Sequence, residues 1–505
     1  MSNVDALDLT SEVTSILNRR PAVGLALGVV RNGSLEFFHA HGEAKIATHT
    51  PITPDTVFRV ASITKTFTAI AVMQLWEQGL VDLDAPANDY LRTYQLIPAK
   101  AGYRPATVRH LLTHTSGISE QLSAGGLLRP DFGESVKQGR PLPTLAEYYR
   151  GGLRLGAEPG TRFRYTDHGP ATLGQIVEDV SRQPLARYLR ECVFEPLGMT
   201  SSELVRSDRL RPQSATGYRL GSHGPRAVTD RDVVPAAAGG AYSTPVDMAR
   251  YLAALLGGGG NEHGTVLKPS TLAMMFEPQY RPDPRMPGMG LGFFRVNAGG
   301  HPVVEHQGIL PGFDSQIFAA PDDGVGVMAF TNGARLAMLW LPTEMGKLLS
   351  SLLGVVDEGV RCDVPQRPEI WPEICGWYYL PGPVKEARLR AMLGAGVEVV
   401  VRGGVLTLRA LSPIPTLYRG FALHPDDPKD PYAFRVDLSA FGIGNVLVVF
   451  GREPKTDTML VHLDVMPLTA RKRPRVTNPR LWARGAAGLA ATSLVARTLR
   501  RPRIR

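Results

Sequence analysis

The spacing of apolar and polar residues along the chain predicts strands near both ends of the first 350 residues and helices between them. Residues 5–19 have the apolar period of an amphipathic helix. The apolar run Val23–Val30 is followed by the hairpin signal Asn32-Gly33, so Leu35–His39 is expected to return as the second strand. Ser62–Gln78 is predicted to be a helix that is apolar on most sides and therefore well buried.

Helical patterns fill the middle of the chain, near residues 107–113, 144–151, 170–191 and 245–256. Strand patterns then return at Leu291–Asn297, His301–Glu305, Phe313–Ala319 and Val325–Asn332. Strands separated from a block of helices favour an α+β fold with one antiparallel β-sheet.

The C-terminal part of the chain has a different pattern. Residues 335–353 are predicted to form a closing helix, after which the chain becomes acidic and contains prolines, as in a linker. Short strands with turns follow, and these favour a small β-rich domain, either a sandwich or a barrel. We therefore expect a first domain at 1–355, a linker at 356–370, a β-rich domain at 371–468 and a basic tail at 469–505.

The composition of the 505 residues, 43% hydrophobic and 20% charged, is that of a chain that buries a sizeable core. The net charge of +9 is concentrated in one place, since Arg471–Arg505 contains eleven Lys or Arg and no Asp or Glu. Removing these charges leaves about −2 for residues 1–470, which argues against a nucleic-acid-binding core. The tail is expected to be disordered; the alternative is peripheral membrane contact, with an apolar side formed by Leu481, Trp482, Leu489, Leu494 and Val495.

The cysteines Cys192, Cys362 and Cys375 are too few and too scattered for a disulfide framework or a zinc site. Met1–Arg20 lacks a continuous apolar run, so neither a signal peptide nor a membrane anchor is expected. These features favour a cytoplasmic protein, with association to a membrane through 471–505 as the alternative.

The first candidate for chemistry is Ser62-Ile63-Thr64-Lys65, which has the form S-x-x-K. At helical spacing, residues i and i+3 share a face, so the Lys65 ammonium is expected beside the Ser62 hydroxyl. A serine hydroxyl needs a base to become a nucleophile, and a lysine can serve if its pKa is lowered. With ten lysines in the chain, one such match arises by chance about half the time, so the motif needs independent support.

That support comes from the surrounding stretches Phe58–Phe67, Gly79–Asp84, His110–Ile118, Pro159–Asp167, Gly239–Ala249 and His306–Gly308. In their order and spacing, they resemble the class C β-lactamase and penicillin-binding-protein-like family of serine hydrolases. The resemblance covers about residues 10–350. It implies an antiparallel β-sheet flanked by helices, with a helical subdomain and with the active site at the junction of sheet and helices.

The resemblance also implies roles for individual residues. Ser62 matches the family nucleophile, Lys65 its activating partner, and Tyr165 the tyrosine of the motif Y-x-N, which shares general acid/base work. Whether Lys65 or Tyr165 is the base stays open. The oxyanion hole would be formed by the backbone N–H groups of Ser62 and Ile309.

The third family motif, K-T-G or H-T-G, is matched by His306-Gln307-Gly308, which is expected to bind substrate. Two residues depart from the family pattern. Asp167 stands where asparagine is usual, and it is expected to hold Lys65 protonated or to contact a cationic substrate. His306 replaces a lysine, and both changes argue against efficient β-lactam hydrolysis.

The sequence therefore predicts a serine hydrolase that forms an acyl-enzyme intermediate with small esters or amides, without metal or organic cofactor. The alternatives are a D-amino-acid-specific peptidase or weak β-lactamase, and a non-catalytic family member with a scaffold or membrane-associated role. The pair His110 and His114 has metal-binding spacing but lacks a third ligand. Small substrates are the expected partners, nucleic acid is not, and the oligomeric state stays open.

Overall fold

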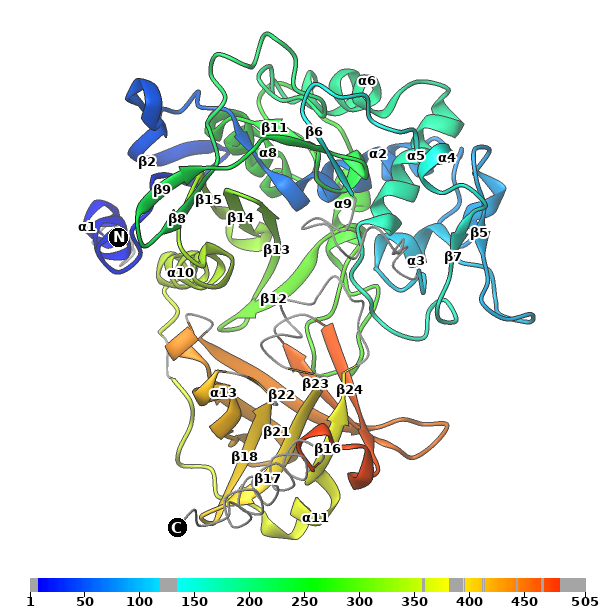
Figure 1. Cartoon of the computed structure of the whole chain (residues 1–505), viewed down its shortest axis with the longest axis vertical. Helices are drawn as coiled ribbons and strands as arrows, with labels where there is room; N and C mark the ends of the chain where they lie inside the picture. Colours follow the sequence, from blue (N-terminus) through cyan, green and yellow to red (C-terminus); the bar gives the residue numbers. More distant parts are fainter. Residues whose placement is uncertain are drawn as a thin grey trace, which may run out of the picture. The chain divides into compact units, whose positions relative to one another are not determined.

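The computed structural model describes residues 8–118, 134–356, 359–380, 394, 396–410, 412, 414–441, 444–464 and 467–481 (Figure 1). The chain divides into two compact units. The first comprises Met1–Glu358 with Ser439–Gly444, and the second comprises Gly359–Leu438 with Asn445–Arg505. We propose that these units are separate domains.

The first unit is built on a seven-stranded antiparallel sheet in the order β12-β13-β14-β15-β1-β2-β3 (Figure 1). The N-terminal hairpin joins the late strands through β1 and β15, with Leu25 opposite Thr331. The predicted α+β fold with an antiparallel sheet is thus confirmed. The strands are β1 (Gly24–Arg31), β2 (Ser34–Lys45), β3 (Thr50–Pro51), β12 (Phe294–Ala298), β13 (His301–Leu310), β14 (Phe313–Ala320) and β15 (Val325–Thr331).

The central strands of this sheet are apolar and buried on both sides. Both faces of the sheet must therefore be covered, and helices cover them. On one face, α1 (Leu9–Arg19) and α10 (Ala337–Leu352) pack against β1 and β15, with Trp340 fully buried. On the other face, α8 (Pro245–Leu256) and α2 (Thr64–Glu77) share the larger core. Every side chain of α2 from Thr64 to Leu75 is buried, as its apolar sequence predicts.

The helical region contains α2, α5 and several shorter helices. The single helix predicted at 170–191 is wrong, because the chain breaks between α5 and α6. Arg182 adopts a left-handed φ of +60°, and Pro184, which has no N–H to donate, starts the next helix. The remaining helices are α3 (Val108–Leu112), α4 (Leu145–Tyr148), α5 (His168–Ser181), α6 (Leu185–Leu189), η5 (Arg190–Phe194), α7 (Ala236–Gly239) and α9 (Pro269–Phe276).

Short strand pairs connect the helical region. Strand β4 pairs with β11 and ends at Arg59, shortly before the turn that carries Ser62. These strands are β4 (Phe58–Arg59), β5 (Leu96–Ile97), β6 (Ser135–Lys137), β7 (Leu153–Arg154), β8 (Tyr218–Gly221), β9 (Gly224–Ala227), β10 (Arg231–Val233) and β11 (Tyr242–Ser243).

The second unit is one antiparallel sheet in the order β19-β18-β17-β16-β24-β23-β22-β21-β20, and it curls into a nearly closed barrel (Figure 1). Tyr378, Phe434 and Phe450 fill its interior. The β-rich prediction is confirmed in its barrel form. The strands are β16 (Gly376–Tyr379), β17 (Gly396–Arg402), β18 (Val405–Ala410), β19 (Phe421–Ala422), β20 (His424–Asp427), β21 (Asp430–Asp437), β22 (Asn445–Arg452), β23 (Met459–Asp464) and β24 (Pro467–Arg473).

The predicted tail begins later than expected. Strand β24 continues to Arg473, because it pairs with β16 and β23 on its two sides. Arg480 then donates to the carbonyls of Ala410 and Tyr418, at 2.6 Å each, which fixes the chain beyond the strand. The rest of the predicted apolar side, Trp482, Leu489, Leu494 and Val495, lies outside the described residues. In the part of the chain that is described, no helix is both long and apolar enough to span a bilayer.

Strand β13 approaches the turn that carries Ser62 at Gly308. A Cβ atom on Gly308 would lie 2.2 Å from the backbone oxygen of Val60 and 2.2 Å from Oγ of Ser315. Cβ atoms do not approach backbone atoms so closely, so the strand and the turn fit together only with glycine here.

We predict that Gly308→Ala lowers both hydrolytic activity and the free energy of unfolding, the latter by about 1–3 kcal/mol, because the Val60 backbone must shift. Urea denaturation measures the change. The control is Gly346→Ala in α10, where the added Cβ meets only Cζ of Phe318 at 3.9 Å. That variant should be as stable as the parent or more stable, as alanine is favoured within a helix. Equal stability of the two variants would contradict the packing account.

Candidate active site

Ser62 lies in a short turn, η3 (Ala61–Ile63), between β4 and α2. Ala61 adopts a left-handed φ of +50°, a conformation that costs about 1–2 kcal/mol for a residue with a Cβ. Neighbouring bonds hold the turn in place: Val60 N–H donates to the carbonyl of Ala241 at 3.1 Å, and Ala241 N–H donates to Oγ1 of Thr64 at 3.0 Å. The turn leaves Ser62 partly exposed at the start of a buried helix.

Lys65 stands one helical turn after Ser62, as the S-x-x-K spacing predicts. Its Nζ donates to Ser62 Oγ at 2.8 Å and to the carbonyl of Ala238 at 2.7 Å. It also forms an ion pair with Oδ1 of Asp167 at 2.7 Å. A lysine ammonium has three N–H donors, and here each has an acceptor. The side chain is only 2% exposed, so this geometry is enclosed by protein.

The charge state of Lys65 follows from these contacts. Burial lowers the pKa of Lys65, but the charge of Asp167, together with Tyr165 and the hydrogen bonds to both residues, outweighs burial and raises the pKa. Lys65 is therefore an ammonium at neutral pH, as expected from the aspartate in place of asparagine.

Asp167 is the N-cap residue of α5, where an aspartate commonly accepts a hydrogen bond from the helix. Its side chain makes no such capping bond and lies instead against Lys65. The side chain is 34% exposed, which leaves part of the carboxylate within reach of a ligand.

The ring of Tyr165 packs between His114, with ring centroids 4.5 Å apart, and Phe294, at 6.0 Å. Nζ of Lys65 lies 5.0 Å from the ring centroid. Burial raises the pKa of Tyr165, and although the charge of Lys65 lowers it, Asp167 raises it further. The phenol is therefore neutral at rest, and Tyr165, Lys65 and Ser62 meet at one place.

His114 lies against Tyr165 and is a site residue that the sequence did not predict. Its φ of +53° is left-handed, and its ring is buried. Its carbonyl accepts from Arg164 N–H at 2.7 Å, and its Nδ1 accepts from Thr166 N–H in a long contact of 3.5 Å. His114 thus holds the backbone on both sides of Tyr165. The stretch His110–Ile118 matches the family pattern and was the only signal in the sequence for this role. The sequence does not show that His114 within it adopts a left-handed backbone conformation.

His110 has a separate structural role. Its Nδ1 accepts from Thr107 N–H at 3.1 Å, and Thr107 caps α3 in return. Among the described residues, no cluster of three or more His, Cys, Asp or Glu side chains could hold a metal ion.

The third predicted motif lies on β13, where alternate residues face opposite sides of the sheet. His306 and Gly308 face the Ser62 turn, whereas Gln307 lies on the α10 side and donates Nε2–H to the carbonyl of Met338 at 2.8 Å. Gln307 can therefore meet a ligand near Ser62 only through its backbone. Burial, together with the charge of Lys65, lowers the pKa of His306 to about 3, so its imidazole is neutral.

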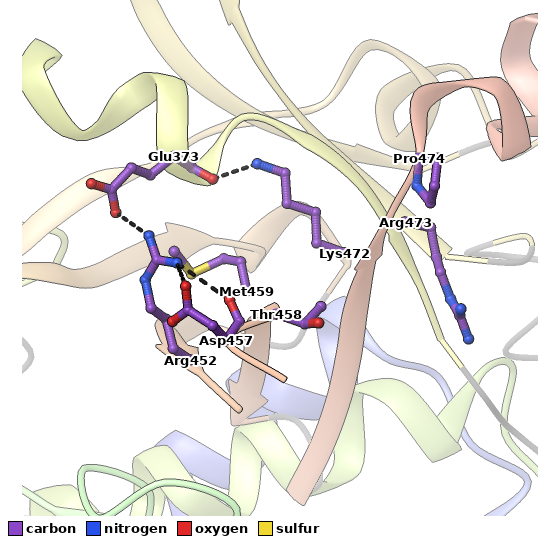
Figure 2. A pocket seen from close by; sticks show the side chains of 8 residues that line it. All are labelled: Glu373, Arg452, Asp457, Thr458, Met459, Lys472, Arg473 and Pro474. Atoms are coloured by element: carbon purple, nitrogen blue, oxygen red, sulfur yellow. Dashed lines mark hydrogen bonds and ion pairs between the residues drawn. The ribbon is translucent and has the colours of Figure 1, made fainter. Parts of the chain in front are cut away.

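One cavity lies apart from these residues, in the second unit (Figure 2). Its volume is about 360 Å³. Arg452 in its wall is paired with Glu373 and Asp457, at 2.9 Å each. No predicted site residue is among its lining residues, which are Glu373, Arg452, Asp457, Thr458, Met459, Lys472, Arg473 and Pro474.

Comparison with known proteins identifies the class to which this fold and site belong. Residues 11–340 match the Beta-lactamase family, and the chain belongs to that family. Penicillin-binding protein 4 of Amycolatopsis lactamdurans is 30% identical over 344 residues, which cover 66% of this chain and 86% of that protein. Esterase EstB of Burkholderia gladioli is 32% identical over 242 residues, covering 46% of this chain and 60% of EstB.

A solved structure shows the same architecture. The octameric penicillin-binding protein homologue from Pyrococcus abyssi is 25% identical, with a TM-score of 0.60, and the similarity covers 92% of this chain and all of that chain. Together the matches show that the protein is a serine hydrolase related to the β-lactamases. The predicted family and enzyme class are confirmed, and the non-catalytic alternative finds no support.

The Lys65–Asp167 pair predicts how activity depends on pH. Asp167 raises the pKa of both Lys65 and Tyr165, so whichever group is the base, it loses its proton only at elevated pH. Asp167→Asn should therefore move the acidic limb of the kcat/KM profile to lower pH, by about one unit or more. A profile with an ester substrate measures this shift.

The control for that profile is Asp208→Asn, which removes the same charge from a side chain that is 92% exposed. Its acidic limb should coincide with that of the parent protein. An Asp167→Asn limb that stays in place or moves to higher pH would show that Asp167 does not control the base.

Proposed function

We propose that the protein hydrolyses small esters or amides in two steps, with Ser62 as the nucleophile. The observation that carries this proposal is the 2.8 Å contact between Lys65 Nζ and Ser62 Oγ in an enclosed site. Ser62 Oγ attacks the carbonyl carbon, its proton passes to Lys65 or Tyr165, and the leaving group departs with a proton. Water then attacks the acyl-enzyme, releases the acid and restores Ser62.

The proton route explains why two groups are needed. At rest Lys65 is an ammonium and Tyr165 is a phenol, so one of them must lose a proton before it can accept that of Ser62. Because Lys65 contacts Ser62 and lies against the Tyr165 ring, a proton can be shared among the three groups. The loss of that first proton makes turnover rise with pH.

The developing negative charge on the carbonyl oxygen needs donors, and we propose the backbone N–H groups of Ser62 and Ile309. In the β13–β14 hairpin, Leu310 and Phe313 are the closing pair, and Ile309 opposes Asp314. Since hydrogen-bonded and non-bonded pairs alternate along antiparallel strands, Ile309 directs its N–H toward the outer edge of β13. Strand β12 pairs with β13 only up to Glu305, so this edge is not covered by that strand at Ile309.

β-Lactam hydrolysis is disfavoured by the same residues. A β-lactam carries a carboxylate near its scissile bond, and a cation at the third motif would bind it. His306 at that position is neutral, and the charge of Lys65 is matched by Asp167. We therefore favour esters and simple amides over β-lactams.

A fluorophosphonate probe tests the proposed nucleophile. The probe should form one adduct on Ser62, located by mass spectrometry of the digested protein, and Ser62→Ala should abolish both the adduct and ester turnover, lowering kcat by about 10⁴-fold or more. The matched control is Ser222→Ala. Ser222 is an exposed serine with a histidine partner, since its Oγ lies 3.0 Å from Nδ1 of His223. An adduct on another residue, or none on the folded protein, would refute the role of Ser62.

A further inference from the structure

The hydrogen-bonding groups around Ser62 limit which substrates can bind there. Lys65 has no free N–H for a substrate, because Ser62 Oγ, the carbonyl of Ala238 and Oδ1 of Asp167 take all its donors. The charges that act on the pKa of Tyr165 are those of Lys65 and Asp167, which have opposite signs and form an ion pair with each other. The described residues around Ser62 therefore present no uncompensated cation for an anionic group.

His306 stands where the third family motif can have a lysine, and it presents a hydrogen-bond acceptor instead of a cation. Its Nδ1 lies 2.8 Å from the carbonyl oxygen of Gln307, which can only accept, so Nδ1 carries the proton. The other ring nitrogen, Nε2, then holds a lone pair, and it has no partner among the described residues. The ring is 1% exposed and packs edge-on against Phe294, with centroids 5.5 Å apart. Its neutral form is therefore enforced by its surroundings.

Asp167 supplies the accessible negative end of the site. Its Oδ1 contacts Lys65, but the part of the chain that is described provides no bond to Oδ2, and the side chain is 34% exposed. An ion pair with one enclosed cation and a partly exposed carboxylate is a dipole whose negative end faces the ligand. Such an end attracts an N–H or ammonium group and repels a carboxylate.

We propose that this hydrolase selects substrates with a hydrogen-bond donor, above all a primary ammonium, on the carbon next to the scissile carbonyl, and that it disfavours a carboxylate there. The preferred substrates are thus α-amino esters and amides with a free amino group. Asp167 Oδ2 receives the ammonium, and the neutral His306 offers no counter-charge for a carboxylate. This inference rests on the proposed function of the same site.

A matched substrate series tests the proposal. Alanyl, propionyl and methylmalonyl p-nitroanilides place an ammonium, a hydrogen or a carboxylate on the same carbon, and the chiral compounds are used in both configurations. Each is measured as a substrate and as a competitive inhibitor of p-nitrophenyl propionate hydrolysis, so slow turnover still yields an order. The full-length protein should prefer the ammonium compound to the carboxylate compound by about tenfold or more, with propionyl between them.

Variants assign the preference to Asp167. In Asp167→Asn, the ratio of the hydrolysis rates of the alanyl and propionyl compounds should fall toward one. Any effect of the substitution on the base changes both rates alike, so it cancels in this ratio. Asp208→Asn, a charge change at an exposed position, should keep the parent ratio. An equal or reversed order in the parent protein, or a ratio unchanged in Asp167→Asn, would overturn the inference.

The failure of this inference can be told apart from failure of the proposed function. If Ser62 takes the fluorophosphonate label and p-nitrophenyl propionate is hydrolysed, the nucleophile stands whatever the order of the anilides. If the folded protein neither takes the label nor turns over the ester, the proposed function fails first.

Discussion

The ion pair between Lys65 and Asp167 is the interaction on which the rest of the site depends. At 2.7 Å, in a place where the lysine is 2% exposed, it compensates a charge whose burial alone would be costly. It also determines the state of its neighbours. Asp167 helps to keep Lys65 as an ammonium and adds to the effect of burial in raising the pKa of Tyr165. The two opposite charges leave no net charge from this pair beside Ser62.

The fold holds this pair together with parts from distant segments of the chain. Lys65 comes from the buried helix α2, and Asp167 comes from the first position of α5. Two residues with left-handed φ, Ala61 and His114, shape the turns that carry Ser62 and brace Tyr165. Such conformations persist only where surrounding contacts determine them, and here those contacts are the backbone bonds to Ala241 and Arg164.

Sequence patterns predicted the parts whose cause is local. The apolar runs of β1 and β15, the apolar helix after Ser62 and the i, i+3 spacing to Lys65 all depend on neighbours in the chain. Features that depend on tertiary contacts were missed. The role of His114 needs its turn to meet the Tyr165 segment, and the facing of Gln307 toward α10 needs the register of β13. The start of the tail was misplaced because β24 is held by pairing with β16, which charge counting does not detect.

The most direct test of this account is the titration of Lys65 itself. Carbon-13 NMR of the lysine ε-carbons can follow all ten lysines of the chain, with Lys65→Arg identifying the signal. The account predicts that Lys65 titrates above its ordinary pKa of 10.5 and that Asp167→Asn lowers this midpoint. A Lys65 signal that titrates near neutral pH in the unmodified protein would contradict it, because the site would then hold a free amine beside Ser62.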